Sequence, residues 1–260
     1  MTLTCKGVDG ATRTARLRLC PRPKTLSTDR ATVGFSIKPG EKVLVHLEVQ
    51  CDPSERQQST EPPPRAFLFA AVAARRALRN ASSRASAIAT SNEAFNEAIR
   101  RSICDIYMLL TEKKTGPYPY AGIPWYSTVF GRDALITALQ TLWLDPLIAK
   151  GVLQYLAVNQ ADHEDPLADA EPGKILHEVR LGEMAELREV PFRRYYGSID
   201  STPLFVMLAG AYLDRTGDVG TLSHLWPHIT RAIDWIERFG DRDGDGFVEY
   251  GRKNKDGLAN

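Results

Sequence analysis

The chain has 260 residues, a hydrophobic share of 43% and a formal net charge of +1 at pH 7. This length suffices for a substantial core in one large domain or two smaller ones. Because basic and acidic residues nearly cancel, the composition argues against binding nucleic acid through counterion release. We therefore expect no nucleic-acid partner.

The sequence favours a cytoplasmic protein. Its longest apolar runs fall well short of a membrane span, so no membrane partner is expected. The first residues, MTLTCKGVDGATR, lack the apolar core of a secretory signal. The cysteines are scattered without a CxxC spacing, which argues against a zinc site and favours reduced thiols. They are Cys5, Cys20, Cys51 and Cys104.

Residues 1–50 alternate apolar and polar side chains, a pattern typical of half-buried strands. The alternation is clear over residues 15–19, 33–37 and 43–49. We predict three strands of an antiparallel sheet with one solvated face. Three strands are too few for a closed sandwich, so they need a partner sheet. Residues 51–65 are polar, contain three consecutive prolines and are predicted to form a linker.

From residue 66 onward the sequence is typical of helices. We predict an alanine-rich helix over residues 66–80 and a second from Thr90, where Glu93 completes a capping box. An irregular segment over about residues 112–131 then precedes a helix over residues 132–144. The apolar stripe of the second helix consists of Phe95, Ile99, Ile103, Ile106 and Leu110.

The next helix has a clear start signal. Asp145 is a good N-cap and Pro146 suits the first helical position, so we predict a helix from there to about residue 160. A second irregular segment follows over residues 161–200, with a short helix near Ile175.

The last two predicted helices flank a tight turn at residues 217–218. The first covers residues 203–215 and is capped by Ser201 or Thr202. The second runs to Phe239, and a third polar loop takes the chain to residue 260.

The connections between these helices alternate between long and short. Short connections make neighbouring helices antiparallel, which puts the long ones at the same end of the array. Loops of roughly 20 and 40 residues in a compact domain are usually functional. The pattern predicts an array of helical hairpins with one elaborated rim. A ring of such hairpins, an α/α toroid, would surround a central cavity, but the pattern leaves ring closure open.

The first candidate site lies in GIPWYSTVFGRDALITALQ, residues 122–140. Aromatic residues, Trp125 among them, precede the charged pair Arg132 and Asp133, and a helix begins there. Sugars stack their C–H faces on aromatic rings and need donors and acceptors for their hydroxyls. A structural alternative is that Asp133 helps to cap the helix and that Arg132 is solvated.

The second candidate site lies in the segment KILHEVRLGE, residues 174–183. If it were helical, His177 and Arg180 would share a face, with Glu183 one turn further on. Glu178 adds another carboxylate. The alternative is a surface helix with its own ion pairs, which contribute little. A zinc protease is excluded, because Leu181 breaks the HExxH pattern.

The third candidate site is YYGSIDSTP, residues 195–203. Tyr196 belongs to a plausible wall for ring stacking, and Asp200 adds a carboxylate. The alternative reading is capping, because Asp200, Ser201 and Thr202 are all good N-caps before a proline.

The segment DRDGDG, residues 241–246, imitates the start of a calcium loop. Its twelfth position is Arg252, where such a loop needs a bidentate glutamate, and Glu249 would replace it only in another geometry. A hydrogen-bonded Asp/Gly turn is therefore favoured. We expect neither a metal nor a cofactor.

Four of these motifs, in order, resemble the bacterial amylo-α-1,6-glucosidase (glycogen debranching enzyme) family, one of the six-hairpin glycosidases that include glucoamylase. They are GIPWYSTVFGRDALITALQ, GKILHEVRLGEMA, YYGSIDSTPLFV and DRDGDGFVEY. The resemblance covers about residues 90–260. It implies an (α/α)6 toroid, and residues 66–260 would form the first half of that toroid. Residues 1–50 resemble the C-terminal part of the family's β-sandwich domain.

The resemblance also implies hydrolysis of α-glucosidic bonds in glycogen-type glucans or oligosaccharides, with inversion by analogy to glucoamylase. Arg132 and Asp133 would hold the hydroxyls of the terminal glucose. The other implied sugar contacts are Trp125, His177, Glu178, Arg180, Glu183, Tyr196 and Asp200.

Such hydrolysis needs two carboxyl groups, one acid and one base or nucleophile. The rim offers Asp133, Glu178, Glu183 and Asp200, and spacing alone selects no pair. The resemblance places the acid and base beyond Asn260, so the chain is expected to be an inactive fragment on its own.

Two alternatives stay open. One is a non-catalytic α-glucan-binding module. The other is a toroid for non-sugar substrates, such as a cyclase or a prenyltransferase, which would need metal or diphosphate ligands. We also expect poor solubility, because half a toroid exposes the apolar helix faces that the other half would cover.

Overall fold

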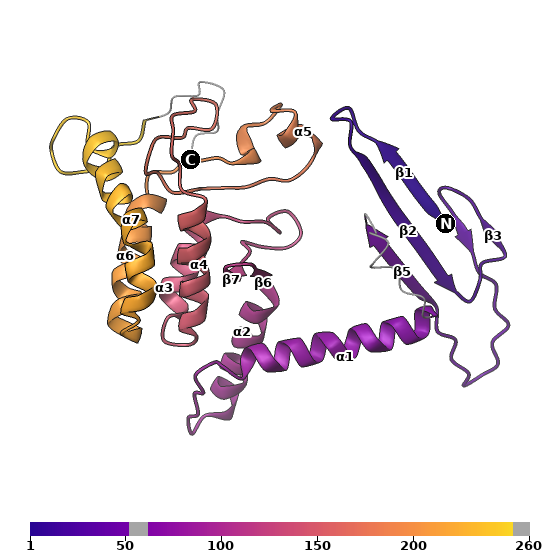
Figure 1. Cartoon of the computed structure of the whole chain (residues 1–260). Helices are drawn as coiled ribbons and strands as arrows, with labels where there is room; N and C mark the ends of the chain where they lie inside the picture. The colour runs from indigo at the N-terminus through magenta and orange to yellow at the C-terminus, as the bar shows by residue number, and fades with distance from the viewer. Residues whose placement is uncertain (52–61, 252–260) are drawn as a thin grey trace. The chain divides into compact units, whose positions relative to one another are not determined.

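The computed structural model describes residues 1–51 and 62–251, and the chain divides into two compact units, residues 1–80 and 81–260. The described residues are mainly helical with small antiparallel sheets, as the sequence predicts (Figure 1). None of the helices in these ranges is long and apolar enough to cross a bilayer. All four cysteines are free thiols. Most of the predicted linker lies outside the described residues.

The first unit contains a three-stranded antiparallel sheet in the order β1-β2-β5. Its strands are β1 (Thr2–Lys6), β2 (Thr12–Cys20) and β5 (His46–Cys51). In the central strand, Ala15 pairs with Leu3 on one side and with Cys51 on the other. A small hairpin of β3 (Thr25–Leu26) and β4 (Ala31–Thr32) follows β2, and helix α1 (Pro63–Ser82) begins in this unit.

Two strand predictions in this unit were wrong. Residues 33–37 form no strand, and Phe35 and Ile37 are 43% and 52% exposed. Alternation stabilises a strand only where a covering layer and a pairing partner exist, and the described residues supply neither to this segment. The third strand begins at His46 rather than at residue 43, and the sequence analysis missed β1.

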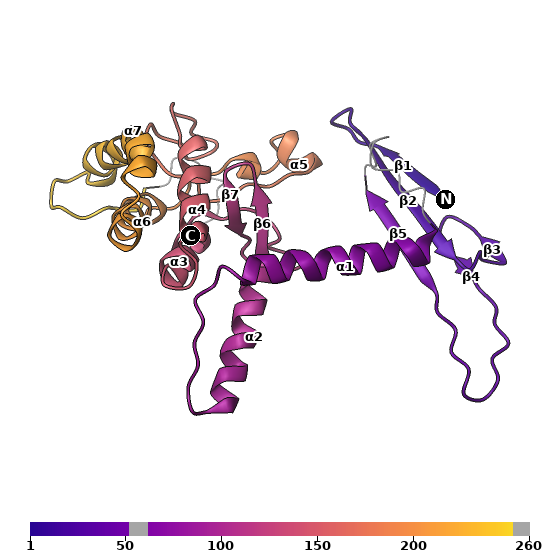
Figure 2. The same cartoon turned by 60° about the horizontal axis from the view of Figure 1, so that its bottom comes forward.

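The second unit is built on two antiparallel helical hairpins. The four helices are α3 (Gly131–Thr141), α4 (Pro146–Val158), α6 (Ser201–Thr216) and α7 (Val219–Trp235). Helix α3 packs against α4 and α6, and α6 packs against α7. Figure 1 shows the four side by side, and Figure 2 shows them tilted toward the viewer.

The core of the second unit lies between these helices. Because α4 packs against α3, α6 and α7, it is buried on several faces, including Ile148 and Leu153. Partners from the other helices include Leu135, Phe205, Leu208 and Ala232, all fully buried. Burial of side chains of this size supplies the main driving force for the unit, at about 1.5–3 kcal/mol each.

Local signals fixed several helix boundaries. Asp145 caps α4 by accepting from the Leu147 N–H at 3.1 Å, with Pro146 in the first turn, as predicted. The turn between α6 and α7 is also as predicted, because Gly217 has a left-handed φ of 66°. Asp218 there caps α7 through the Thr221 N–H at 3.0 Å.

Two predicted caps were wrong. Helix α2 (Glu93–Leu109) is capped by Asn92, whose Oδ1 accepts from the Phe95 N–H at 3.1 Å, and not by Thr90. Ser201 and Thr202 lie within α6 and do not precede it, and α6 has no side-chain cap.

Short elements occupy the segments between the helices. The hairpin of β6 (Leu110–Lys113) and β7 (Gly116–Pro119) lies where an irregular segment was predicted. The helix predicted near Ile175 is absent from the described residues; α5 (Glu183–Glu186) and a 3-10 turn, η2 (Pro191–Arg193), follow later. A π-helical turn, η3 (Ile236–Gly240), ends the last helix.

The long connections of the second unit meet at one end of the helices. The N-termini of α3 and α6 lie at the end where α4 and α7 finish, since each hairpin is antiparallel. Residues 120–130, 159–200 and 241–251 therefore form a common rim, visible above the helices in Figure 1. The described residues show two hairpins of the predicted array and no closed ring.

Candidate functional site

Three segments that are far apart in the sequence join at the rim. Glu178 forms antiparallel bridges with Phe130 and with Tyr195, so residues 130, 178 and 195 lie side by side. The Gly131 N–H donates to the His177 carbonyl at 2.7 Å, which ties the start of α3 to the middle segment. These are the three segments that the sequence analysis singled out for sugar binding.

Gly131 allows this close approach. A Cβ at this position would lie 1.8 Å from the carbonyl oxygen of Leu176, far inside any normal contact distance. Glycine is needed where one backbone passes directly against another. The glycine of the FGRD motif therefore has a structural role: it lets the backbone at Leu176 and His177 pack against the first turn of α3.

Arg132 and Asp200 pair across two helix N-termini. The Nη1 of Arg132 lies 3.4 Å from Oδ2 of Asp200, and the side chains are 39% and 38% exposed. Arg132 belongs to the first turn of α3, and Asp200 precedes α6. The other oxygen of Asp200, Oδ1, is buried and has no hydrogen-bond partner among the described residues. The capping role considered for Asp200 is not seen, because its side chain makes no cap bond.

Asp133 is exposed beside this pair. The N-cap of α3 is Phe130, which has no side-chain cap bond, so Asp133 is not used as the cap. A carboxylate in the first turn is nevertheless favoured by the helix dipole. Together Arg132 and Asp133 line a hollow of about 500 Å³ between α2 and α3.

His177 lies beneath the pair. Its side chain is only 3% exposed and meets Phe130 and Tyr195 edge-on, with ring centroids 6.0 and 6.1 Å away. Burial lowers the pKa of His177, the positive charge of Arg132 lowers it further, and Asp200 and Asp133 oppose this. Burial thus favours the neutral imidazole, and its Nδ1 has no partner among the described residues.

Arg180 clamps the aromatic loop. Its guanidinium forms an ion pair with Glu178 and donates to the Trp125 carbonyl at 2.8 Å. It also lies over the Phe130 ring, 5.3 Å from the centroid. The prediction that His177 and Arg180 share a helix face was wrong, because this segment is extended and the pair joins residues two apart, as in a strand.

The remaining predicted site residues, Trp125, Tyr196 and Glu183, lie at different places along the rim. Trp125 is 78% exposed near the clamp, so its ring is free to stack on a ligand. Tyr196 is buried, and its hydroxyl donates to the Asn159 carbonyl at 2.8 Å in a second hollow. Glu183 begins α5, whose last residue, Glu186, also lines that second hollow. The structure thus separates Tyr196 and Glu183 from the Arg132–Asp200 pair.

A buried polar network that the sequence analysis missed supports the rim. The Lys174 ammonium donates to the Asp169 carbonyl at 3.0 Å, and the Tyr195 hydroxyl donates to the Asp169 carboxylate at 3.0 Å. The Trp235 indole donates to Glu171 at 2.8 Å, which joins the network to α7. Little in the sequence indicates such a network, since acidic residues in a polar loop are usually solvated.

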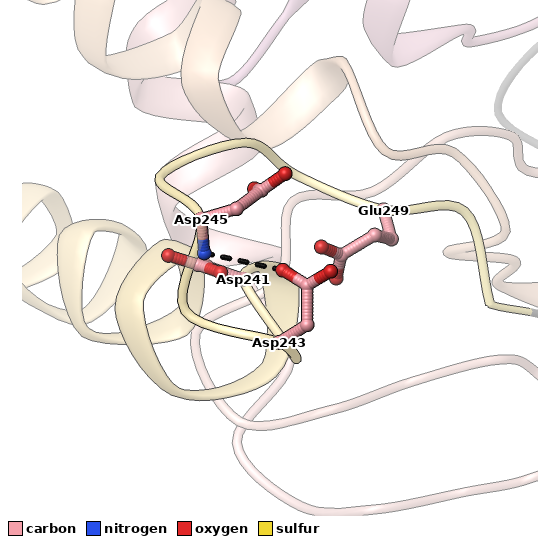
Figure 3. A group of neighbouring side chains, drawn as sticks. All are labelled: Asp241, Asp243, Asp245 and Glu249. Atoms are coloured by element: carbon pink, nitrogen blue, oxygen red, sulfur yellow. Dashed lines mark hydrogen bonds between the residues drawn. The ribbon is translucent and has the colours of Figure 1, made fainter.

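The acidic loop after α7 brings four carboxylates together (Figure 3). Single oxygens of Asp241, Asp243, Asp245 and Glu249 all lie within 4.8 Å of one another. Backbone N–H groups already use several of them: Asp241 accepts from Gly244 at 2.7 Å and from Gly246 at 3.0 Å. This is the hydrogen-bonded Asp/Gly turn that the sequence favoured. Arg252, the twelfth loop position, lies outside the described residues.

Comparisons with known proteins leave the family resemblance a prediction. No protein-family model matches the chain, and no curated protein matches it. The geometry therefore carries the functional argument: an arginine, two carboxylates, a buried neutral imidazole and an exposed indole gathered at one rim.

Proposed function

We propose that this chain supplies the sugar-binding wall of a glycoside hydrolase acting on α-glucosidic bonds of glycogen-type glucans or oligosaccharides. The observation that carries the proposal is the Arg132–Asp200 pair at the adjoining ends of α3 and α6, with Asp133 exposed beside it. A guanidinium and two carboxylates offer donors and acceptors at fixed positions for neighbouring hydroxyls.

Two further features support a sugar ligand. Trp125 presents an indole ring to solvent where a sugar face would stack, and Arg180 fixes its backbone. The hollow lined by Arg132 and Asp133 is within the size range of small-ligand sites, and most of its other lining residues are apolar. We place this rim in an (α/α)6 toroid, of which the two described hairpins would be part.

A second candidate is a non-catalytic α-glucan-binding module. It is favoured by the state of the rim carboxylates: Glu178 is engaged by Arg180, and Asp200 is engaged by Arg132. Hydrolysis needs one carboxyl group free to give a proton and another free to activate water or attack. If the protein is a hydrolase, its acid and base would be carboxyl groups other than Glu178 and Asp200.

Calorimetric titration with maltotriose, together with an assay for released reducing sugar, tests the proposal. We expect binding that Asp133→Ala weakens by about tenfold, the equivalent of one lost charged hydrogen bond. Asp214→Ala, on α6 and away from the rim, is the matched control and should bind like the wild type. Unchanged affinity in Asp133→Ala would remove the basis of the proposal.

The same titration separates the two candidates. Binding accompanied by sugar release supports the hydrolase, whereas binding without release supports the module.

A further inference from the structure

A second hollow, of about 740 Å³, lies at the same rim. The end of α4 and two loop segments form it, residues 159–170 and 179–196. It shares no lining residue with the hollow beside Arg132. Tyr155 and Tyr196 contribute their rings, so part of the wall is aromatic.

The acidic side chains that line this hollow are already engaged. Their contacts are Asp162 with His163 at 2.6 Å, Asp165 with the Leu167 N–H at 3.1 Å, and Glu186 with Arg193 at 3.2 Å. Arg193 neutralises Glu186, whereas Asp162 and Asp165 keep their charge, because a histidine near neutral pH and a backbone N–H do not cancel it.

Two arginines in the lining remain unpaired. Arg188 and Arg194 have no carboxylate within ion-pair distance among residues 1–51 and 62–251. Burial raises the pKa of Tyr196 and the positive charge of Arg194 opposes that rise, so the guanidinium lies near enough to Tyr196 to act on it. The wall thus offers two guanidinium groups that no carboxylate of the described residues holds in an ion pair, together with the carboxylates of Asp162 and Asp165.

The backbone of Arg188 is strained. Its φ is 58°, in the left-handed region, directly after Leu187, the C-cap of α5. Glycine is preferred at such a position, and another residue costs about 1–2 kcal/mol there. The turn itself needs no side chain, and backbone strain of this kind is concentrated at ligand-binding sites. An arginine at this strained position is explained if its guanidinium binds a ligand.

We propose that this hollow binds a phosphate monoester of about the size of a sugar phosphate. Planar guanidinium groups hold phosphate oxygens through paired hydrogen bonds, and Arg188 and Arg194 offer two of them. The Tyr155 hydroxyl adds a further polar group, and the aromatic wall suits an attached ring. The volume exceeds that of phosphate alone and lies within the usual range for small ligands.

Calorimetry on the full chain at low ionic strength tests the proposal, with inorganic phosphate and glucose 1-phosphate as probes. We expect both to bind and Arg194→Ala to weaken binding about tenfold or more. Arg188→Gly should weaken binding similarly while its melting temperature stays equal or rises, because the strain is relieved. If Arg188 had a purely structural role, its substitution would not weaken binding while leaving the melting temperature equal or higher.

Arg101→Ala is the control, since Arg101 is an exposed arginine on α2 that pairs with Asp105. It should bind both probes with wild-type affinity. Three results would overturn the proposal: no binding of either probe at millimolar concentration, equal affinity in the wild type and both hollow variants, or equal binding of glucose 1-phosphate and uncharged maltose. The test is independent of sugar binding at Arg132, because it concerns other residues and a charged probe.

Discussion

At Gly131, the absence of a side chain allows two rim segments of the candidate site to pack against each other. Gly131→Ala would place a methyl group 1.8 Å from the Leu176 carbonyl oxygen, next to the hydrogen bond from the Gly131 N–H to the His177 carbonyl. We expect a loss of about 1–3 kcal/mol in the free energy of unfolding, measured by urea denaturation.

Gly210→Ala is the matched control for this substitution. Gly210 also lies in a helix, α6, but a Cβ there would meet nothing within 4 Å. Alanine should raise stability by about 0.5–1 kcal/mol. Equal effects of the two substitutions would contradict the close packing at Gly131.

His177 gives the rim a pH dependence. Its pKa is below 6.5 in the folded chain, chiefly because of burial, so the unfolded chain binds a proton more readily. The stability that depends on the neutral imidazole is therefore present above about pH 6.5 and is lost as pH falls below it.

The test compares urea midpoints at pH 7.5 and pH 5.5. Wild type should lose more stability across this interval than His177→Gln. His228→Gln serves as the control for a second histidine, whose pKa is lowered by burial and by Arg231. The same pH dependence in wild type and His177→Gln would contradict the account.

At the scale of elements, caps fix the helices on which the site depends. Asp145 caps α4 and also accepts from the buried Tyr107 hydroxyl at 2.9 Å. Asp145→Ala should lower stability by about 2–4 kcal/mol, because both the cap and the tyrosine lose a partner.

Asn92→Ala is the comparison, since the Asn92 side chain caps α2 through one bond. It should cost only about 1 kcal/mol. Thermal or urea denaturation measures both, and equal losses would show that the contacts of Asp145 with Tyr107 and Arg84 contribute nothing.

Elements set by local chemistry could be predicted, whereas those set by distant partners could not. Asp145 and Gly217 carry their signal within a few residues, so both boundaries were found. Residues 33–37 alternate like a strand but lack a partner. The bridges through Glu178 join three segments across the rim, and no local pattern encodes them.

The same distinction applies to the candidate site. FGRD and the aromatic loop could be found because rings and charges stand together in the sequence, and the structure joins Arg132 to Asp200. The separation of Tyr196 from that pair could not be predicted. Adjacent residues in an extended segment point to opposite sides, so Tyr195 faces His177 while Tyr196 faces the second hollow.

At the scale of the molecule, the core belongs to the second unit. Every buried hydrophobic residue among the described residues lies between Tyr107 and Trp235, and the described part of the first unit includes no buried hydrophobic residue. All four tryptophans also fall in the second unit.

We therefore expect residues 81–260 alone to melt with a tryptophan-fluorescence midpoint within about 5 °C of the full chain. Such a shift corresponds to roughly 1 kcal/mol or less. Loss of the transition on removing residues 1–80 would show that the first unit is needed for the core.

Exposed apolar side chains affect how the whole chain behaves in solution. Phe67, Leu68 and Phe69 on α1 are 60%, 61% and 64% exposed, and Trp226 on α7 is 62% exposed. Exposed apolar groups of this size favour association. Light scattering should show self-association that grows with concentration, and a monodisperse chain at high concentration would contradict this expectation.

The claim that three separate rim segments form one sugar site is tested most directly by hydrogen exchange with and without maltotriose. We predict that exchange slows in residues 122–133, 174–180 and 195–200 together, with no change in residues 1–51. Unchanged exchange in these segments at saturating maltotriose, or protection confined to residues 188–194, would contradict it.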